Sequence, residues 1–160
     1  MCNYKSDVMV EIERKYLINT KLWNPSEKGT KIKQGYLSVD PERVVRVRVA
    51  GEKAYITIKG IPKGIVRTEL EYGIPKNEAE VLLMMCLDFP IEKTRFKESI
   101  GNIIWEIDVF EGENKGLVLA EVELADENQK IDLPNWAGEE VSLDSRYYNA
   151  WLSRNPFSKW

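Results

Sequence analysis

The chain has 160 residues, 43% of them hydrophobic and 31% charged, which suits one domain with a sizeable core. A net charge of −3 argues against a general nucleic-acid-binding protein, which usually has a basic excess. The absence of histidine excludes Ser-His-Asp and Cys-His catalysis, so any metal would need oxygen ligands, which suit magnesium or manganese.

In chain order, alternating apolar and polar residues predict eight strands. They lie near residues 8–17, 31–39, 43–50, 53–60, 65–74, 91–98, 102–111 and 116–125. Between the fifth and sixth, helical spacing in "NEAEVLLMMCL" predicts a helix over 77–87. A short strand near 139–143 and a helix over about 144–153 follow. We predict a single domain over 1–160 that is mainly antiparallel β with a few helices.

Neither cysteine indicates a structural or metal-binding role. Cys2 and Cys86 have neither the pattern of a disulfide framework nor zinc-ligand spacing. No long apolar run or signal-peptide pattern is present, so we expect no membrane partner and a location in the cytoplasm.

Charged residues repeat at every second position of most predicted strands, which places them on one face of each strand. "VVRVRVA" holds Arg46 and Arg48, and "AEVELA" holds Glu121 and Glu123. For a single strand, a solvated face with cross-strand ion pairs is the ordinary interpretation. Pairs of like charge repel, however, unless a group of opposite sign lies between them.

Closure of the eight strands into a barrel with these faces inward would bring basic and acidic side chains together in nearly equal number. A metal-bound polyphosphate would give both kinds of side chain a partner. Burying so many charges rarely stabilises a fold, so the pattern indicates function. The apolar outer faces would then need covering by the 77–87 helix and flanking segments.

The first predicted strand contains "EIERKYL", which resembles the E-x-E-x-K signature of the CYTH superfamily, the triphosphate tunnel metalloenzymes. The resemblance continues in order through "QGYL" (34–37), "RVR" (46–48), "TIKG" (57–60), "RTELEY" (67–72), "KTR" (93–95), "WEIDVF" (105–110), "LAEVEL" (119–124) and "SRYYNAWL" (145–152). It implies a closed eight-stranded antiparallel β-barrel, a tunnel with a charged interior, and a C-terminal helix that caps one end. The short chain is most similar to the small bacterial members, in which hydrolysis of inorganic tripolyphosphate is the commonest activity.

The resemblance also implies a role for each inward charge. The implied metal ligands, for one or two Mg²⁺ or Mn²⁺ ions, are Glu11, Glu13, Asp108, Glu121 and Glu123. The implied phosphate contacts are Lys15, Arg46, Arg48, Lys59, Arg67, Lys93 and Arg95. The remaining carboxylates, Glu69, Glu71 and Glu106, are expected to orient the basic residues. For the general base we expect Glu121 or Glu13, with Lys15 as the second candidate if neighbouring cations lower its pKa.

These expectations lead to one favoured function and two alternatives. The favoured one is metal-dependent hydrolysis of a triphosphate, tripolyphosphate first, with ATP or thiamine triphosphate as further candidates. The alternatives are a class IV adenylyl cyclase and a non-catalytic module that binds polyphosphate or nucleotide. The sequence shows no feature assignable to adenine, thiamine or RNA, and it leaves monomer and homodimer open.

Overall fold

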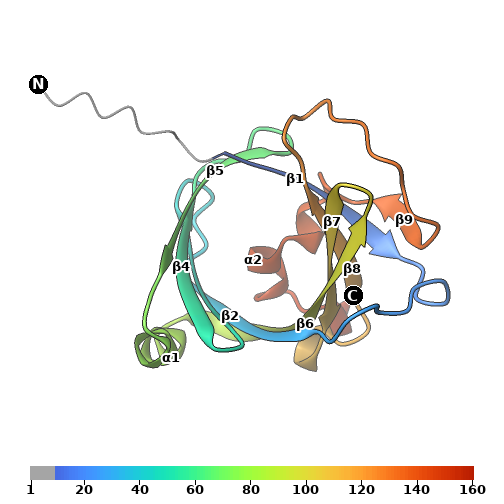
Figure 1. The fold of residues 1–160 in the computed structure, drawn as a ribbon. Helices are drawn as coiled ribbons and strands as arrows, with labels where there is room; N and C mark the ends of the chain where they lie inside the picture. Colours follow the sequence, from blue (N-terminus) through green and yellow to red (C-terminus); the bar gives the residue numbers. More distant parts are fainter. Residues whose placement is uncertain (1–9) are drawn as a thin grey trace, which may run out of the picture.

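A computed structural model describes residues 10–160, and nine strands of one antiparallel sheet form most of this part of the chain. The strands are β1 (Val10–Ile18), β2 (Thr30–Ser38), β3 (Val44–Ala50), β4 (Lys53–Lys59), β5 (Val66–Gly73), β6 (Leu87–Ile100), β7 (Ile103–Phe110), β8 (Val118–Glu123) and β9 (Ala137–Glu140). Their order is β5-β4-β3-β2-β6-β7-β8-β1-β9, and pairing of β5 with β1 closes a barrel (Figure 1). The predicted eight-stranded barrel is confirmed, with β9 as an extra strand beside β1.

The hairpin turns follow from the sequence. Gly51 and Gly101 have φ of 57° and 59° at the first position of two-residue loops, which join β3 to β4 and β6 to β7. Only glycine adopts that conformation at little cost. Most predicted strand ends agree with the structure to within two residues, but residues 8 and 9, like Cys2, lie outside the described residues.

One side of the barrel is covered by the predicted helix, α1 (Lys76–Met84), which packs against β3 and β4. Ala79 is fully buried against Val47 and Ala54 of these strands. The helix ends earlier than the predicted residue 87, and β6 begins at Leu87 rather than near 91. Asp88, with a φ of 56°, lies in this early part of β6, so the alternating pattern did not reveal it.

Gly35 of β2 lets the end of α1 approach the barrel. A Cβ built at Gly35 would lie 2.8 Å from both Cβ and Sγ of Cys86. Gly35→Ala should therefore destabilise the protein by about 1–3 kcal/mol through overpacking. Gly73→Ala is the control, because a Cβ at Gly73 meets nothing within 4 Å. Equal denaturation midpoints for the two variants would contradict this account of Gly35.

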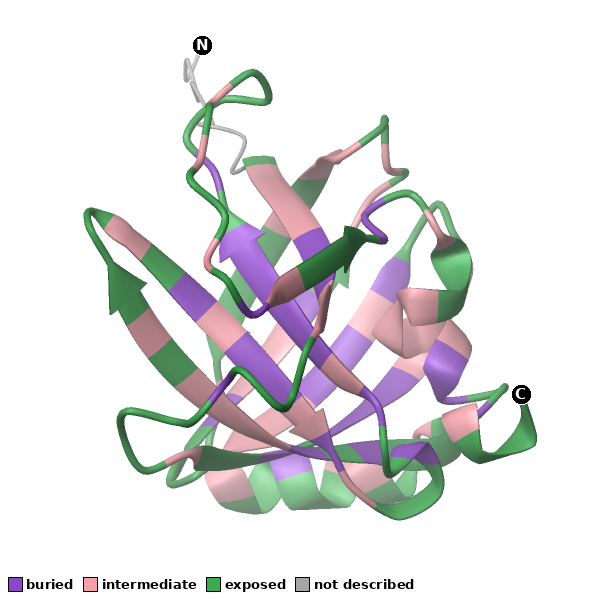
Figure 2. Ribbon diagram, turned by 90° about the vertical axis from the view of Figure 1, so that its right-hand side faces the viewer, coloured by how far each residue is buried: buried purple, intermediate pink, exposed green. Residues whose placement is uncertain are grey.

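On another side, aromatic residues cover the outer faces of β1, β7 and β8. Figure 2 faces this side and shows buried residues along its strands. Trp105, fully buried, packs edge-on against Tyr16 and Trp136, with ring centroids 5.5 Å and 5.4 Å away. Trp136 and Trp23 come from connections for which the sequence predicted no regular structure. These two connections therefore help to cover the apolar outer faces of the strands.

The C-terminal segment lies at one end of the barrel, as predicted, but the single helix predicted over 144–153 is wrong. A 3-10 turn, Ser145–Tyr147, is followed by the short helix α2 (Asn149–Leu152) and a second 3-10 turn, Phe157–Lys159. Tyr148 separates the first two with an extended backbone (φ −77°, ψ 133°). Among residues 10–160, no helix is long and apolar enough to cross a membrane.

Leu152 of α2 is fully buried at this end of the barrel. It belongs to a cluster with Ile91, Phe110 and Leu119, which share the inward faces of β6, β7 and β8 with the charged residues. Beside α2, the inner faces of β6, β7 and β8 are therefore apolar, and the charged residues of these strands lie beyond. Figure 1 shows α2 within the outline of the barrel.

Candidate active site

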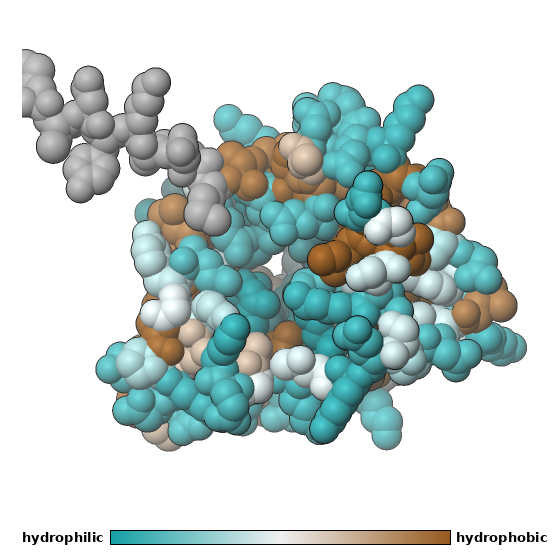
Figure 3. Space-filling view, viewed as in Figure 1, coloured by the Kyte–Doolittle hydropathy of each residue, from teal (hydrophilic) through white to brown (hydrophobic). Residues whose placement is uncertain are grey.

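The predicted charged residues line a passage through the barrel. Two cavities, of about 590 Å³ and 710 Å³, share Glu11, Glu13, Lys15, Arg46, Lys59 and Asn149 in their linings. The first opens at the α2 end and the second at the other end. Figure 3 shows hydrophilic residues around a central opening, viewed as in Figure 1.

The two ends differ in their chemistry. Arg67, Ile65 and Trp151 are among the residues that line only the cavity at the α2 end. The other cavity alone is lined by Arg48, Glu69, Glu71, Lys93, Arg95, Glu106, Glu121 and Glu123. The apolar surface beside α2 is a feature that sequence analysis missed, because distant loops and the C-terminal segment supply it.

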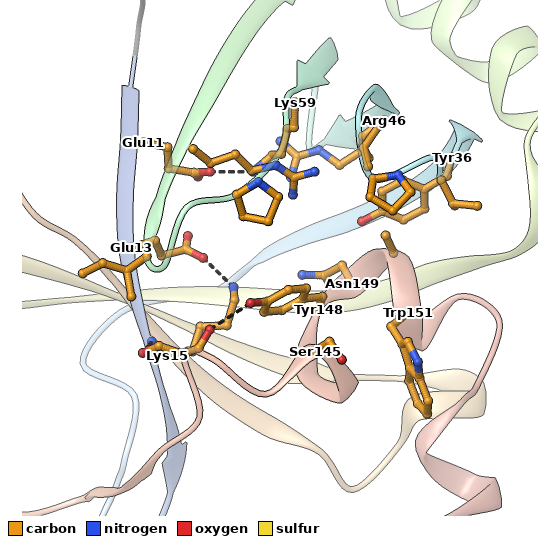
Figure 4. Close-up of a pocket in the computed structure, with 18 of the residues that line it drawn as sticks. Glu11, Glu13, Lys15, Tyr36, Arg46, Lys59, Ser145, Tyr148, Asn149 and Trp151 are labelled. Carbon is orange, nitrogen blue, oxygen red and sulfur yellow. Dashed lines mark hydrogen bonds and ion pairs between the residues drawn. The ribbon is translucent and has the colours of Figure 1, made fainter. Parts of the chain in front are cut away.

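Most basic residues of the passage are paired with carboxylates. Lys15 donates to both Glu13 and Glu121, and Lys59 lies 2.7 Å from an oxygen of Glu11 (Figure 4). Glu69, 2.6 Å away, is a second partner of Lys59. Glu69, like Glu106 beside Arg95, belongs to the carboxylates expected to orient basic residues, whereas Glu11, Glu13 and Glu121 are the expected metal ligands.

The two arginines of β3 share one carboxylate. Arg46 and Arg48 each donate to Glu71, at 3.2 Å and 3.3 Å, and Arg46 also donates to Thr57. The Nε atoms of both arginines are buried without a hydrogen-bond partner in the described residues. Unpaired buried donors are rare and costly, so these two N–H groups have capacity for the oxygens of a bound anion.

Asp108 lies deeper than the other predicted metal ligands. It is fully buried, and Arg95 binds its two oxygens in a bidentate pair, both distances being 2.7 Å. Lys93 also donates to Asp108. In the structure Asp108 therefore serves as a counter-ion for two cations, and its assignment as a metal ligand stays a prediction.

Burial and neighbouring charge shift the pKa values of the lysines in opposite directions. Burial alone would lower the pKa of Lys15, but Glu121 and Glu13 outweigh it and raise this pKa above its ordinary value. The condition set for Lys15 as a base, a pKa lowered by neighbouring cations, is therefore not met in the metal-free fold. Burial does lower the pKa of Lys93, to about 8, against the opposing attraction of Asp108.

The carboxylates divide into two groups. Burial raises the pKa of Glu11, Glu13 and Glu123, and nearby carboxylates add to each shift. Burial would also raise the pKa of Glu121, but Lys15 and Arg95 hold it well below the usual range. Around Glu11, Glu13 and Glu123, the negative charge of the carboxylates therefore exceeds the positive charge of neighbouring lysines and arginines.

The carboxylates with raised pKa values, Glu11, Glu13 and Glu123, fit a hard divalent cation. Glu13 and Glu123 are direct cross-strand partners of β1 and β8, a pairing of like charges that is unfavourable without a cation. Carboxylate oxygens are the ligands that Mg²⁺ and Mn²⁺ prefer. Within residues 10–160, no three acidic side chains already converge on one point, since most face Lys or Arg.

A closed barrel with paired cations and carboxylates along its passage defines a tunnel protein for a multiply charged anion. The chain belongs to the CYTH domain family, which matches residues 9–149. The resemblance seen in the sequence is confirmed.

Known relatives cover nearly the whole chain. A protein of Acetivibrio thermocellus named inorganic triphosphatase is 45% identical over 148 residues, 92% of this chain and 95% of the relative. A second inorganic triphosphatase, from Nitrosomonas europaea, is 34% identical and covers 91% of this chain and 97% of its own length. A crystal structure of an inorganic triphosphatase is also 34% identical, with a TM-score of 0.65 over 89% of this chain and 93% of that one.

More distant structures share the fold alone. One, of a putative adenylate cyclase from Bacillus halodurans, is 17% identical, with a TM-score of 0.56 over 73% of this chain and 81% of that one. At this identity the likeness carries no information about the reaction.

Proposed function

We propose that this protein hydrolyses inorganic tripolyphosphate to pyrophosphate and phosphate inside the tunnel, with a divalent metal ion. The observation that carries the proposal is a buried row of cations beside a group of carboxylates, Glu11, Glu13 and Glu123, whose negative charge exceeds the positive charge around it. Two of the cations, Arg46 and Arg48, have unpaired N–H groups. The names of both relatives support this substrate, and the cyclase is not favoured.

The basic residues would bind the phosphate chain. Arg46 and Arg48 suit phosphate oxygens because both line the passage and their buried Nε groups have no hydrogen-bond partner among the described residues. Arg67 has no carboxylate within ion-pair distance among the described residues, so its charge is available at the α2 end. Lys15, Lys59, Lys93 and Arg95 would supply further charge along the passage.

The metal would be held by Glu11, Glu13 and Glu123, with Glu121 beside them. When bound, the ion neutralises phosphate charge and favours attack of water on the terminal phosphorus atom. Asp108 is assigned instead to holding Lys93 and Arg95, because both of its oxygens are already in use.

The attacking water must lose a proton as the bond between the terminal phosphorus and the bridging oxygen breaks. Of the three predicted bases, Lys15 is held protonated because its pKa is raised. Glu121 is a weak base because its pKa is lowered. The pKa of Glu13 is raised in the metal-free fold, which favours it over Glu121 as the proton acceptor. A bound cation would lower this pKa, so the general-base role of Glu13 stays a prediction from the sequence. Lys93, with a pKa of about 8, is a second group that can exchange a proton in this range.

The test is phosphate release by EDTA-treated protein from tripolyphosphate, ATP, thiamine triphosphate and pyrophosphate, each with Mg²⁺ or Mn²⁺. We expect metal-dependent release from tripolyphosphate that exceeds release from ATP. The apolar surface beside α2 is the reason to include organic triphosphates. Cyclic AMP from ATP without phosphate release would favour the cyclase, and tight binding without either product would favour the non-catalytic module. A cytoplasmic location and a monomer or homodimer stay predictions from the sequence.

Metal binding should depend on pH in a defined direction. The fold raises the pKa of Glu11, Glu13 and Glu123 above the ordinary 4.5. The protonated carboxyl groups therefore stabilise the metal-free fold at low pH. This stabilisation is lost as pH rises through the raised pKa values. A cation must displace the same protons. Mg²⁺ should therefore raise the melting temperature more at about pH 8 than at about pH 5.5.

Scanning calorimetry with and without Mg²⁺ at both pH values measures this difference. Glu92→Gln is the control variant, since Glu92 lies on the barrel exterior and pairs only with Lys33, 3.6 Å away. A larger Mg²⁺ effect at the lower pH would show that these carboxylates are not the metal site.

A further inference from the structure

One side chain in the passage does not come from the barrel. Asn149, the first residue of α2, lines both cavities, and its Oδ1 accepts a hydrogen bond of 3.2 Å from Lys93. Figure 4 shows Asn149 at the end of α2 that faces Lys15 and Glu13. The sequence carried no signal for it, since a lone asparagine after two tyrosines is ordinary at the start of a helix.

Lysine chemistry fixes the orientation of the Asn149 amide. An ammonium group has only donors, so the oxygen of the amide must face Lys93 and the Nδ2 group must point away from it. Nδ2 has no hydrogen-bond partner among residues 10–160, and it borders the cavities. An N–H donor in this position matches an oxygen of a phosphate group.

Lys93 itself is held on several sides. Its ammonium donates to Asp108 and lies 5.3 Å from the centre of the Phe110 ring, and the residue is 2% exposed. Asn149 is the one contact of this ammonium that does not belong to a barrel strand. The position of the C-terminal segment therefore bears directly on a cation in the passage.

The segment that carries Asn149 is firmly anchored. Leu152 is buried in the apolar end of the barrel, Tyr148 donates to the carbonyl of Ser142 at 3.2 Å, and Phe157 donates from its backbone to Asn114 at 2.9 Å. Such anchors can hold a side chain in the fixed geometry that binding an anion requires.

We propose that Asn149 is a further active-site residue: its Nδ2 donates a hydrogen bond to a phosphoryl oxygen of the bound triphosphate while its Oδ1 holds the ammonium of Lys93. The C-terminal segment then contributes to substrate binding and does more than cover the barrel. The inference rests on the proposed function, since it takes a triphosphate as the ligand.

The experiment compares Asn149→Ala, Asn149→Asp and Asn77→Ala. Aspartate keeps an oxygen towards Lys93 but replaces the Nδ2 donor with a second oxygen that repels phosphate. Asn77→Ala is the matched control, since Asn77 is exposed on α1 outside the barrel and lines neither cavity. We measure kcat, KM and melting temperature with tripolyphosphate and Mg²⁺.

Loss of a hydrogen bond to a charged oxygen should lower kcat/KM of Asn149→Ala about 10- to 100-fold, with melting temperature changed by less than about 2 °C. Asn149→Asp should be impaired at least as strongly, chiefly through KM, and Asn77→Ala should match the wild type. Wild-type kinetics for either Asn149 variant would overturn the inference. In particular, an active Asn149→Asp would mean that the residue only holds Lys93.

Failure of the proposed function looks different. In that case the wild-type protein itself releases no phosphate from tripolyphosphate. The rise in melting temperature caused by tripolyphosphate then tests the contact without turnover. Asn77→Ala should keep this rise and Asn149→Asp should lose it, whereas equal rises in the two variants would overturn the inference.

Discussion

Replacing Glu13 with alanine or glutamine should abolish metal-dependent phosphate release while leaving the barrel folded. Glu13 lies beside Lys15, opposite Glu123 and within the group of carboxylates whose pKa values are raised. It is assigned both to the metal and, among the predicted bases, to proton transfer. Loss of such a group should cost about 4 kcal/mol of transition-state stabilisation, roughly a 1,000-fold fall in kcat.

The same substitution should not harm stability. Glu13 repels Glu123 across the β1–β8 pair, and Lys15 keeps Glu121 as a partner when Glu13 is removed. A buried carboxylate with a raised pKa destabilises the fold at neutral pH, so its removal should leave the melting temperature of the metal-free protein unchanged or higher.

The measurements are phosphate release, melting temperature, and the rise in melting temperature caused by Mg²⁺. Glu92→Gln, which removes a carboxylate from the barrel exterior, should retain all three. Normal turnover by Glu13→Gln would exclude Glu13 from the reaction, and an unfolded variant would mean that Glu13 mainly stabilises the barrel.

The periodicity of the sequence was sufficient for much of this site. A spacing of two places Arg46 with Arg48, and Glu121 with Glu123, on one face of a strand, whichever strand lies beside it. Closure of the barrel then decides that these faces point inward. The inward charged surface could therefore be predicted from the strands one at a time.

Depth along the barrel could not be predicted in the same way. Asp108 and Glu121 look alike in the alternating pattern, yet Asp108 lies nearer the apolar end, where Lys93 and Arg95 enclose it. Strand register sets this depth, and register depends on partners far away in the chain.

The C-terminal segment was hardest to predict. Its sequence pattern predicts a helix, but the backbone of Tyr148 is extended and interrupts it. This break accompanies the packing of Leu152 into the barrel and the hydrogen bond from Tyr148 to the carbonyl of Ser142. Tertiary contacts of this kind override local propensity. The same break brings Asn149 into the passage, where no sequence motif marked it.

Replacing Asp108 with asparagine should have the opposite effect to replacing Glu13. The substitution removes the one carboxylate that pairs with buried Lys93 among the described residues, whereas Arg95 loses Asp108 but keeps Glu121 and Glu106. Breaking a buried ion pair from one side costs about 3–5 kcal/mol, which for a chain of this size lowers the melting temperature by about 10 °C. The rise in melting temperature caused by Mg²⁺ should persist, since Glu11, Glu13 and Glu123 remain.

A second substitution tests whether an unpaired Lys93 causes the loss of stability in Asp108→Asn. Adding Lys93→Met to Asp108→Asn removes the buried cation that has lost its carboxylate partner. The double variant should recover part of the lost stability, because an apolar side chain of similar length avoids the desolvation of a charge. A stable Asp108→Asn protein that no longer responds to Mg²⁺ would instead make Asp108 the metal ligand that the sequence predicted. The comparison with Glu13→Gln therefore separates carboxylates that hold cationic side chains from carboxylates that hold the metal.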